Sequence, residues 1–403
     1  MDAQTKPVER VIGLDAHPDT FTAAILRGPT PAQAVEEKTF NRVPNTRLIS
    51  WAEKHTTDAD VLVLEASGNS FHLARSLIAI GRRALVLESC QMGRLKEAHA
   101  NNDKISALRI AKAYLAGTAK TVWIPDEKTQ ARRDLFHAHR KAVKRTTQLR
   151  NRLSSYLSDN GVRLKPGTEL SEPGQAEAQL RSRHHWSSVQ WQIIDGLLQE
   201  LRHADQMRSH WRSAIAQEVI QDPLLLSMVR LCGIREVIAF ALGAIIGDIH
   251  RFAEPKKLVK YIGLNPAFDD SGESKWRGGI GGHGRKDLRA LLIEAAQSIL
   301  RSKDPAARWG KRLLARKGSL ALAASAVARK LTVAVWYLMM GRWTELQELG
   351  RPLQIKISKI LSHARVEAMG KTRKELREAL AASLQKGRVY HLDPAITFRP
   401  SPA

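Results

Sequence analysis

The chain has 403 residues, 43% of them hydrophobic, which is enough for two or three domains with packed cores. Its 64 lysines and arginines against 40 acids give a formal charge of +24, which favours a polyanionic partner. A membrane protein is disfavoured, because the longest apolar run carries Arg329 and Lys330 near its centre. We expect that run to be a buried helix whose basic pair leaves on one side. The polar N-terminus, and two cysteines far apart in apolar segments, Cys90 and Cys232, predict a cytoplasmic, nucleoid-associated protein.

Residues 1–127 alternate strand and helix signals. "RVIGLDAH" and "FTAAILRG" predict a hairpin, and "AVEEKTFNR" predicts a third strand. A helix "NTRLISWAEKH", capped by Asn45, precedes the strand "DVLVLEAS", the helix "SFHLARSLIAIG" and the strand "RRALVLES". The helix that contains Asp103 and the segment "TVWIP" follow. Antiparallel strands followed by a β-α-β pattern predict an α/β domain.

Residues 128–220 predict two long helices joined by the link "KPGTELSEPG". Leu135, Ala142, Leu149 and Tyr156 recur every seven residues, and apolar positions from Ile194 to Ile215 repeat the pattern, which indicates an antiparallel arm or a coiled-coil interface. Residues 128–165 hold 11 basic residues against two acids. A solvated helix face is the simpler interpretation, but this imbalance favours nucleic-acid contact. The residues that we expect to make it are Arg140, Lys141, Lys144 and Arg145.

Residues 221–350 are expected to be mainly helical. Two short helices flank Gly233, "PKKLVKYIGL" is another helix, and "DLRALLIEAAQSIL" and the apolar run near 319–341 follow. Between them, "NPAFDDSGESKWRGGIGGHGRK" is the least regular segment, which we interpret as a loop. Residues 351–403 form a weakly patterned, partly helical tail.

Three acids stand at positions where sites commonly form. Asp15 follows the strand "VIGL", Glu65 follows "VLVL", and Asp103 begins a helix. If the two strands are neighbours in a sheet, Asp15 and Glu65 come close, and Asp103 can join them. Crowded carboxylates repel unless a divalent cation lies between them, and carboxylate oxygens suit Mg²⁺. Taken singly, the acids have simpler interpretations: a turn former, an exposed strand end and a helix cap.

The motifs "IGLDAH", "LEASGNS" and "NNDKISALRIAKAY" resemble those of the insertion-sequence-110 type transposases, which include pilin-gene invertases. The resemblance spans roughly residues 10–345 and implies a RuvC-like domain of ribonuclease H fold with four acids in the order Asp, Glu, Asp, Asp. Asp15, Glu65 and Asp103 match the first three. The fourth position, one helical turn after Asp103, is Ser106, which would be a weaker metal ligand.

The C-terminal motifs "LCGIREVIAFALGAIIGDIHRF", "YIGLNPAFDDSGESKWRGG" and "GRKDLRALLIEAA" resemble the transposase domain of the same family. By that resemblance Ser271 is the catalytic nucleophile, and Lys275, Arg277, Arg285 and Lys286 could hold phosphates. A flexible surface loop and an Asx-type turn are the alternative interpretations of the segment. Residues 271–318 hold 12 basic residues and four acids, which favours nucleic-acid contact here too.

The expected organisation is therefore a RuvC-like metal-binding domain at 1–127, a basic helical arm at 128–220, a transposase domain at 221–350 and a tail at 351–403. The resemblance implies a recombinase that cleaves and rejoins target and donor DNA through a phosphoserine link. It further implies a composite site of the Mg²⁺-binding acids and the serine, an element-encoded noncoding guide RNA, and assembly as a homodimer or tetramer. Because Ser106 replaces an acid, a catalytically weakened nucleic-acid-binding relative is the alternative. A nuclease that uses water would leave the Ser271 segment unexplained.

Overall fold

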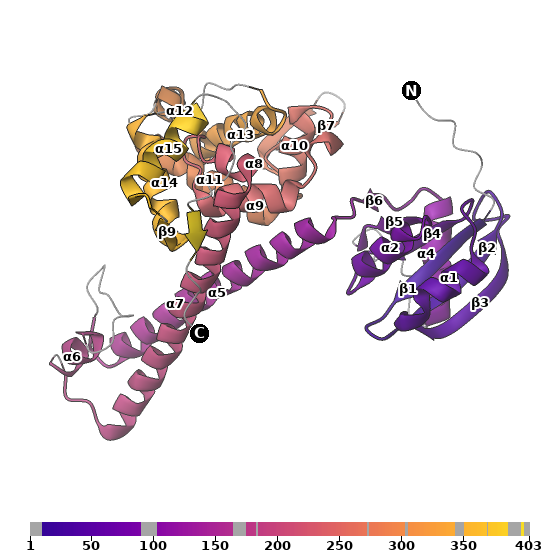
Figure 1. Ribbon diagram of the computed structural model, residues 1–403, viewed down its shortest axis with the longest axis horizontal. Helices are drawn as coiled ribbons and strands as arrows, with labels where there is room; N and C mark the ends of the chain where they lie inside the picture. Colours follow the sequence, from indigo (N-terminus) through magenta and orange to yellow (C-terminus); the bar gives the residue numbers. More distant parts are fainter. Residues whose placement is uncertain are drawn as a thin grey trace. The chain divides into compact units, whose positions relative to one another are not determined.

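The computed structural model describes residues 10–89, 103–163, 175–182, 184–271, 274–302, 305–342, 350–368, 370–385 and 396–398 (Figure 1). The chain divides into two compact units, Met1–Lys128 and Thr129–Ala403. The first unit is α/β and the second is mostly helical, which confirms the expected fold class at this coarse level.

The first unit is built on a six-stranded sheet in the order β3-β2-β1-β4-β5-β6. Its strands are β1 Arg10–Ala16, β2 Thr20–Arg27, β3 Val35–Pro44, β4 Val61–Glu65, β5 Arg83–Leu87 and β6 Thr121–Val122. Its helices are the short η1 Asn45–Arg47, then α1 Leu48–His55, α2 Ser70–Ala79 and α4 Asp103–Leu115. β1 pairs antiparallel with β2 and parallel with β4, and β4 pairs parallel with β5. This hairpin followed by parallel strands is consistent with the expected RuvC-like domain.

Side-chain alternation assigns each face of this sheet to different helices. Ile12, Leu14 and Leu62 share a buried cluster with residues of α1 and α2. Val11 and Val63 belong to the cluster formed with α4. Successive side chains of a strand point to opposite faces. Odd-numbered residues of β1 and β4 therefore face α4, and Asp15 and Glu65 share that parity.

Asn45 has a different role from the helix cap that we predicted. Its side-chain oxygen accepts no hydrogen bond from the described residues, so it caps no helix. Its amide nitrogen instead donates to the carbonyl oxygens of His17 and Pro18, at 3.0 and 2.9 Å. The prediction was wrong because a local sequence pattern cannot reveal that the β1–β2 turn lies within reach of this amide.

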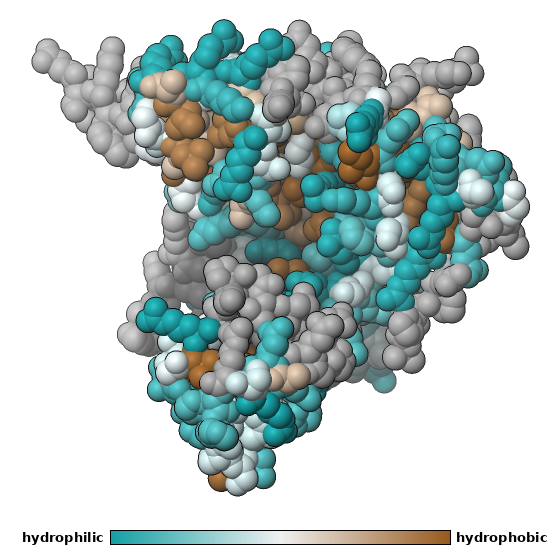
Figure 2. Space-filling view, turned by 90° about the vertical axis from the view of Figure 1, so that its left-hand side faces the viewer, coloured by the Kyte–Doolittle hydropathy of each residue, from teal (hydrophilic) through white to brown (hydrophobic). Residues whose placement is uncertain are grey.

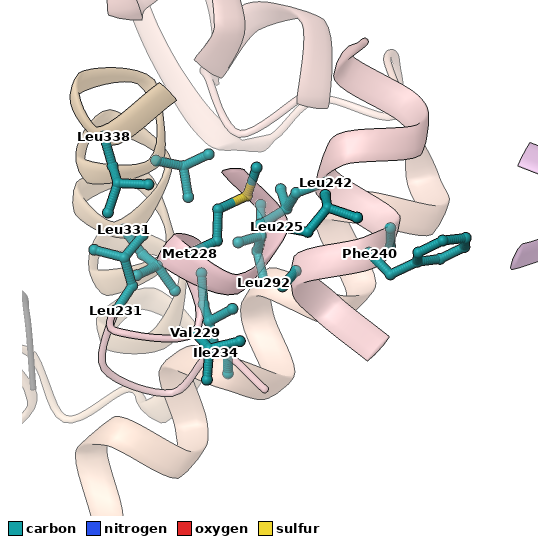
Figure 3. Close-up of a cluster of buried hydrophobic side chains, with 14 of the residues drawn as sticks. Leu225, Met228, Val229, Leu231, Ile234, Phe240, Leu242, Leu292, Leu331 and Leu338 are labelled. Carbon is teal, nitrogen blue, oxygen red and sulfur yellow. The ribbon is translucent and has the colours of Figure 1, made fainter. Parts of the chain in front are cut away.

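The second unit consists mainly of helices around one large core. The helices are α5 Glu127–Asp159, which begins just before the boundary, α6 Gln175–Arg181, α7 Ser188–Gln221, α8 Pro223–Met228, α9 Glu236–Ile246, η2 Ile249–Arg251, α10 Pro255–Ile262, α11 Lys286–Arg301, α12 Pro305–Lys317, α13 Leu320–Met339, α14 Arg351–His363 and α15 Arg373–Gln385. Its strands are β7 Pro266–Ser271, β8 Ser274–Ile280, β9 Val366–Ala368 and β10 Ile396–Phe398. Figure 3 shows side chains of α8, α9, α11 and α13 converging on one another in the core.

The two long helices α5 and α7 pack together through a separate cluster that includes Leu149, Leu153, Leu197 and Leu201. The heptad prediction is correct for Ala142 and Leu149, which are buried. Leu135 and Tyr156, at the ends of the repeat, are half-buried and pack against the core clusters, beside the fully buried Phe136 and Leu157. The contact between α5 and α7 is therefore established, while a coiled-coil interface between copies of the chain stays a prediction.

Helix α13 is long and apolar enough to cross a membrane, but most of its apolar window is buried inside the second unit. Arg329 and Lys330 are exposed on its surface, as predicted for a core helix with a basic edge. Lys330 lies over the ring of Trp309, with its Nζ 4.3 Å from the ring centroid. Cys232 is likewise buried in the core, whereas Cys90 lies outside the described residues.

The segment that we interpreted as a loop contains an antiparallel strand pair, β7 and β8. Backbone pairing joins Asp269 to Trp276 and Ser271 to Ser274. The strands escaped prediction because Asp, Gly and Ser have low strand propensity, and strand pairing depends on a partner strand that periodicity does not reveal.

Candidate functional site

Asp15 and Glu65 occupy adjacent strand ends. In the parallel pairing of β1 with β4, Leu14 lies opposite Leu64, and the two acids are the next residue on each strand. Neighbouring strands lie about 4.7–4.9 Å apart. Both acids face the side of the sheet that α4 covers, as their parity with Val11 and Val63 requires. The expectation that these strands are neighbours is therefore confirmed.

Helix α4 supplies Asp103, and Gly13 determines how closely that helix approaches the sheet. A Cβ atom at Gly13 would lie 1.9 Å from the carbonyl oxygen of Ala107 and 2.9 Å from the amide nitrogen of Ala111. The backbone of α4 therefore rests directly on β1, which only a glycine permits. This contact brings Asp103, at the start of α4, to the same end of the sheet as Asp15.

Asp15, Asp103 and His17 form a compact cluster. The donor atoms of the three side chains all lie within 4.8 Å of one another. The Nε2 atom of His17 is 3.5 Å from Asp15 Oδ2 and 3.5 Å from Asp103 Oδ1. That nitrogen is buried and makes no hydrogen bond to the described residues. Two carboxylates and an orphaned imidazole nitrogen at these separations can serve as ligands of a divalent cation.

Glu65 and Ser106 lie beside this cluster. Glu65 is half-buried at the end of β4 and is not among the three clustered side chains. Ser106 is half-buried and lies one helical turn after Asp103 in α4. Residues three apart on a helix share a face. An acid at position 106 would therefore lie on the same side of α4 as Asp103, whereas the hydroxyl of Ser106 brings no charge.

The loops around the cluster are tied together by an asparagine. The amide nitrogen of Asn69, which precedes α2, donates to the carbonyl oxygen of His17 at 2.9 Å. Together with Asn45, it holds the turn after β1 from two directions. The turn that carries His17 is thus fixed against the loop that follows Glu65.

Besides His17, Arg42 also lies close to the acids, and the sequence analysis did not predict either residue as part of the site. Its Nε atom lies 3.6 Å from Asp103 Oδ2, and its side chain is 80% exposed. Its φ angle of 50° falls in the left-handed region, at an irregularity in the pairing of β2 with β3. Non-glycine residues rarely adopt that conformation, and they cluster at functional sites. The "DAH" triplet was a possible signal for His17, but no local pattern marks Arg42.

The strand pair that ends at Ser271 is held at its base between α10 and α11. The amide of Arg285 donates to the carbonyl oxygen of Tyr261 at 3.0 Å, which joins the two flanking segments. Gly263 ends α10 with a φ angle of 81°, and a Cβ atom there would lie 2.0 Å from the carbonyl oxygen of His283. The backbone thus positions Ser271 at the far end of β7. The side chains of Ser271, Lys275 and Arg277 lie outside the described part of the structure.

The basic residues of α5 divide into internal and surface groups. Arg132 forms ion pairs with Glu218 and Asp222, at 3.0 and 2.8 Å. The guanidinium of Arg133 donates to the carbonyl oxygens of Ala244 and Ile245 near the end of α9. These residues fasten α5 to its own unit, so the count of 11 basic residues overstates the charge available to a partner.

The basic residues that we expected to contact nucleic acid also differ in whether they are paired within the protein. Arg145 forms an ion pair with Glu200 of α7, and Arg285 forms two hydrogen bonds to Asp287. Arg145 is nevertheless exposed, as are Arg140, Lys141, Lys144 and Lys286. Figure 2 shows one face of the molecule on which hydrophilic residues predominate and hydrophobic residues gather in separate patches.

An α/β unit with acids at adjacent strand ends, joined to a helical unit rich in basic residues, suits a protein that acts on nucleic acid. Residues 12–160 match the family model DEDD_Tnp_IS110, described as a transposase, and residues 227–309 match the transposase IS116/IS110/IS902 family. The two matches follow in order and together span more than half of the chain. The protein belongs to the IS110-type transposases.

Several relatives carry the same function in their names. The transposase-like protein y4qE of Sinorhizobium fredii is 27% identical over 58% of this chain, and that match spans 56% of y4qE. The transposase for insertion sequence element IS1111A of Coxiella burnetii is 23% identical over 83% of this chain and 91% of its own length. The transposase for insertion sequence element IS1328 of Yersinia enterocolitica is 21% identical over 74% of this chain and 88% of its own.

Proposed function

We propose that this protein is a DNA transposase in which Asp15, Glu65 and Asp103 hold Mg²⁺ and Ser271 is the nucleophile. The observation that carries the proposal is the convergence of Asp15 and Asp103 within 4.8 Å of His17, next to the strand end of Glu65. Membership of the transposase family supports the choice of DNA as substrate.

The reaction follows from the chemistry of the residues. The oxygen of the Ser271 hydroxyl attacks a DNA phosphorus atom, forms the serine–phosphate bond and loses its proton to a base. The bond from phosphorus to a sugar oxygen breaks, and that oxygen takes up a proton. Attack by a sugar hydroxyl of another strand reverses these steps, joins the DNA and restores the serine. A bound Mg²⁺ ion would neutralise charge that develops on the phosphate.

We propose that an element-encoded noncoding RNA guides the choice of target and donor DNA. The +24 charge supports binding of two polyanions, and the exposed basic side chains of α5 are the contacts that we propose. In this scheme base pairing reads the sequence, while the protein contacts backbone and shape. Assembly as a homodimer or tetramer belongs to the same proposal.

A catalytically weakened nucleic-acid-binding protein is the second candidate function. The observation that favours it is Ser106, half-buried on the same side of α4 as Asp103. With fewer carboxylates to balance the cation, metal affinity falls, and strand cleavage would then need more Mg²⁺ or fail.

A covalent-complex assay separates the two functions. The full chain, RNA transcribed from the encoding element and its flanks, and labelled target DNA are incubated with Mg²⁺ and then denatured with detergent. We expect DNA to remain attached to the protein, to be lost in Ser271→Ala and to be retained in the control Ser274→Ala. Binding without attachment in the unchanged protein would favour the weakened relative. Attachment by Ser271→Ala would show that the nucleophile is a different residue.

Metal binding is measured separately, without nucleic acid. The electron paramagnetic resonance signal of free Mn²⁺, a substitute for Mg²⁺, falls as the ion binds the protein. Asp15→Asn removes a charge from the cluster, whereas Asp19→Asn removes one from the neighbouring exposed turn. We expect only Asp15→Asn to weaken binding strongly. Equal affinity of both variants would contradict the proposed metal centre.

A further inference from the structure

The second unit contains a cavity of about 630 Å³ between α5, α7, α9 and α11, the helices that Figure 1 shows in the second unit. Its lining includes His139, Arg140, Val143, Lys144, Arg235 and Leu291. None of them belongs to the acid cluster or to the β7–β8 strand pair. This volume lies within the range of small-ligand sites in proteins, about 300–1,000 Å³.

The lining has an apolar part contributed by three helices. Val143 comes from α5, Val237 and Ile238 come from α9, and Leu291 comes from α11, whereas Phe136 lies fully buried behind them. Val143 is 39% exposed, so an apolar side chain is presented at the opening. Such a surface favours a flat or apolar group that leaves water on entering the cavity.

Positive charge predominates on the rest of the lining. Arg140, Lys144 and Arg235 are exposed. Arg140 has a distant ion pair, with its Nη1 3.9 Å from Asp287 Oδ2, and neither Lys144 nor Arg235 forms an ion pair with the described residues. Lys144 and Arg235 can therefore meet an anionic ligand directly, and Arg140 can do so by giving up its distant ion pair with Asp287.

The buried acid of the lining does not offset this charge, because it is already paired. Oε1 of Glu236 accepts hydrogen bonds from Nε and Nη2 of Arg212, at 3.0 and 2.7 Å. Nδ1 of His363 lies 3.0 Å from the same oxygen. Glu294 is exposed. The lining therefore carries more positive than negative charge.

We propose that this cavity binds one unstacked nucleotide of a single nucleic-acid strand, with the base on the apolar lining and the flanking phosphates on Arg140, Lys144 and Arg235. The proposal rests on the function proposed above, because it assigns a subsite to a nucleic acid that the protein handles. RNA and DNA share this chemistry. The side chain of His139, 7% exposed, adds a polar group to the lining that can meet a base edge.

The test compares strands with and without bases. The full chain is titrated with fluorescent 12-residue strands of oligodeoxythymidine, of oligouridine and of abasic residues. A base held on the protein contributes about 1–3 kcal/mol, so we expect base-bearing strands to bind roughly 5- to 150-fold more tightly than the abasic strand. The strand type that shows the larger preference identifies RNA or DNA as the source. No preference in the unchanged protein would overturn the proposal.

Two variants of one residue then locate the effect. Val143→Phe fills the opening of the cavity and should remove most of the preference for bases. Val189→Phe, at a valine of α7 that is 64% exposed and does not line the cavity, is the matched control and should retain it. Val143→Ala adds no bulk, so it should fold even if Val143→Phe does not, and it should reduce the preference. A full preference in Val143→Ala and Val143→Phe alike would refute the site.

The charged part of the lining is tested by salt dependence. Lys144→Gln should lower the affinity for base-bearing and for abasic strands by the same factor. It should also reduce the slope of log affinity against log salt concentration by about 1. An unchanged slope would remove Lys144 from the proposal. Tight binding of an acidic 12-residue peptide that Val143→Phe abolishes would indicate a protein partner instead. Covalent attachment to DNA is measured in a separate assay. The proposal of a nucleotide site and the proposal of transposase activity can therefore be refuted independently of each other.

Discussion

Substituting Gly13 by alanine should disturb the acid cluster from a distance, through the packing of α4. The added Cβ atom would lie 1.9 Å from a backbone oxygen of α4, and real Cβ contacts are essentially never under 3.0 Å. The helix must therefore retreat locally by about 1 Å, and overpacking of this kind costs about 1–3 kcal/mol. For a unit of this size the melting temperature should fall by roughly 4–12 °C.

The same displacement should weaken metal binding. Asp103 begins α4, so a helix that moves away from β1 carries its carboxylate away from Asp15. A shift of about 1 Å is half of a Mg²⁺–oxygen bond, which is about 2.0–2.1 Å long. Substitution of residues that hold metal ligands in position typically lowers metal affinity about 10- to 100-fold. We expect a loss of that size in the Mn²⁺ titration.

The control is Gly196→Ala in α7, because a Cβ atom at Gly196 would meet no atom within 4 Å. Replacing an interior helical glycine by alanine should raise stability by about 0.5–1 kcal/mol. Its metal affinity should equal that of the unchanged protein. Calorimetry and the Mn²⁺ titration are carried out on all three proteins. If Gly13→Ala melts and binds metal like the unchanged protein, α4 does not depend on this contact and the reasoning fails.

Three further outcomes are expected. Ser106→Asp should raise the affinity for metal and the rate of strand exchange. Without metal it should lower the melting temperature slightly, because the added carboxylate repels the others. If strand exchange and melting temperature both stay unchanged across a Mg²⁺ titration, position 106 does not face the metal. Affinity for nucleic acid should fall about 10³-fold between 50 and 200 mM salt if six or more phosphates are neutralised, and a flat response would contradict the electrostatic role of the basic residues. Burial lowers the pKa of His139 from 6.5 to about 4. Between these two pH values the imidazole is protonated in the unfolded chain and neutral in the folded chain. The free energy of unfolding should therefore be unaffected by this residue above pH 6.5 and should fall by about 2–3 kcal/mol as the pH is lowered to 4. His139→Gln should remove this dependence, so the free energy of unfolding should vary less with pH in that range.

Much of the first unit was predictable because its signals are local. The apolar runs before Asp15 and Glu65 predict buried strands, and burial on both faces of a sheet produces such runs. The hairpin, the third strand and the helices before and after β4 also follow from short-range patterns. The strand pair that ends at Ser271 did not, since its residues are poor strand formers and its pairing involves a partner strand.

The surroundings of the acids depended on contacts between distant parts of the chain. Arg42 reaches Asp103 only because β3 lies at the edge of the same sheet and bends at an irregular pair. His17 reaches both carboxylates because asparagines from two other segments hold its turn. Neither arrangement has a signature in the sequence, because each is a consequence of which segments become neighbours after folding.

The sequence by itself indicated the class of this protein through the resemblance of its motifs to those of IS110-type transposases. The order of most strands and helices, the acids at strand ends and the excess of positive charge follow from composition and local periodicity. Tertiary structure alone decided which charges are available. Arg132 and Arg133 count equally with Lys144 in the sequence, yet packing turns these two arginines toward their own unit and leaves Lys144 at a cavity. Which charges are used internally depends on pairs far apart in the chain, because an ion pair depends on proximity in space.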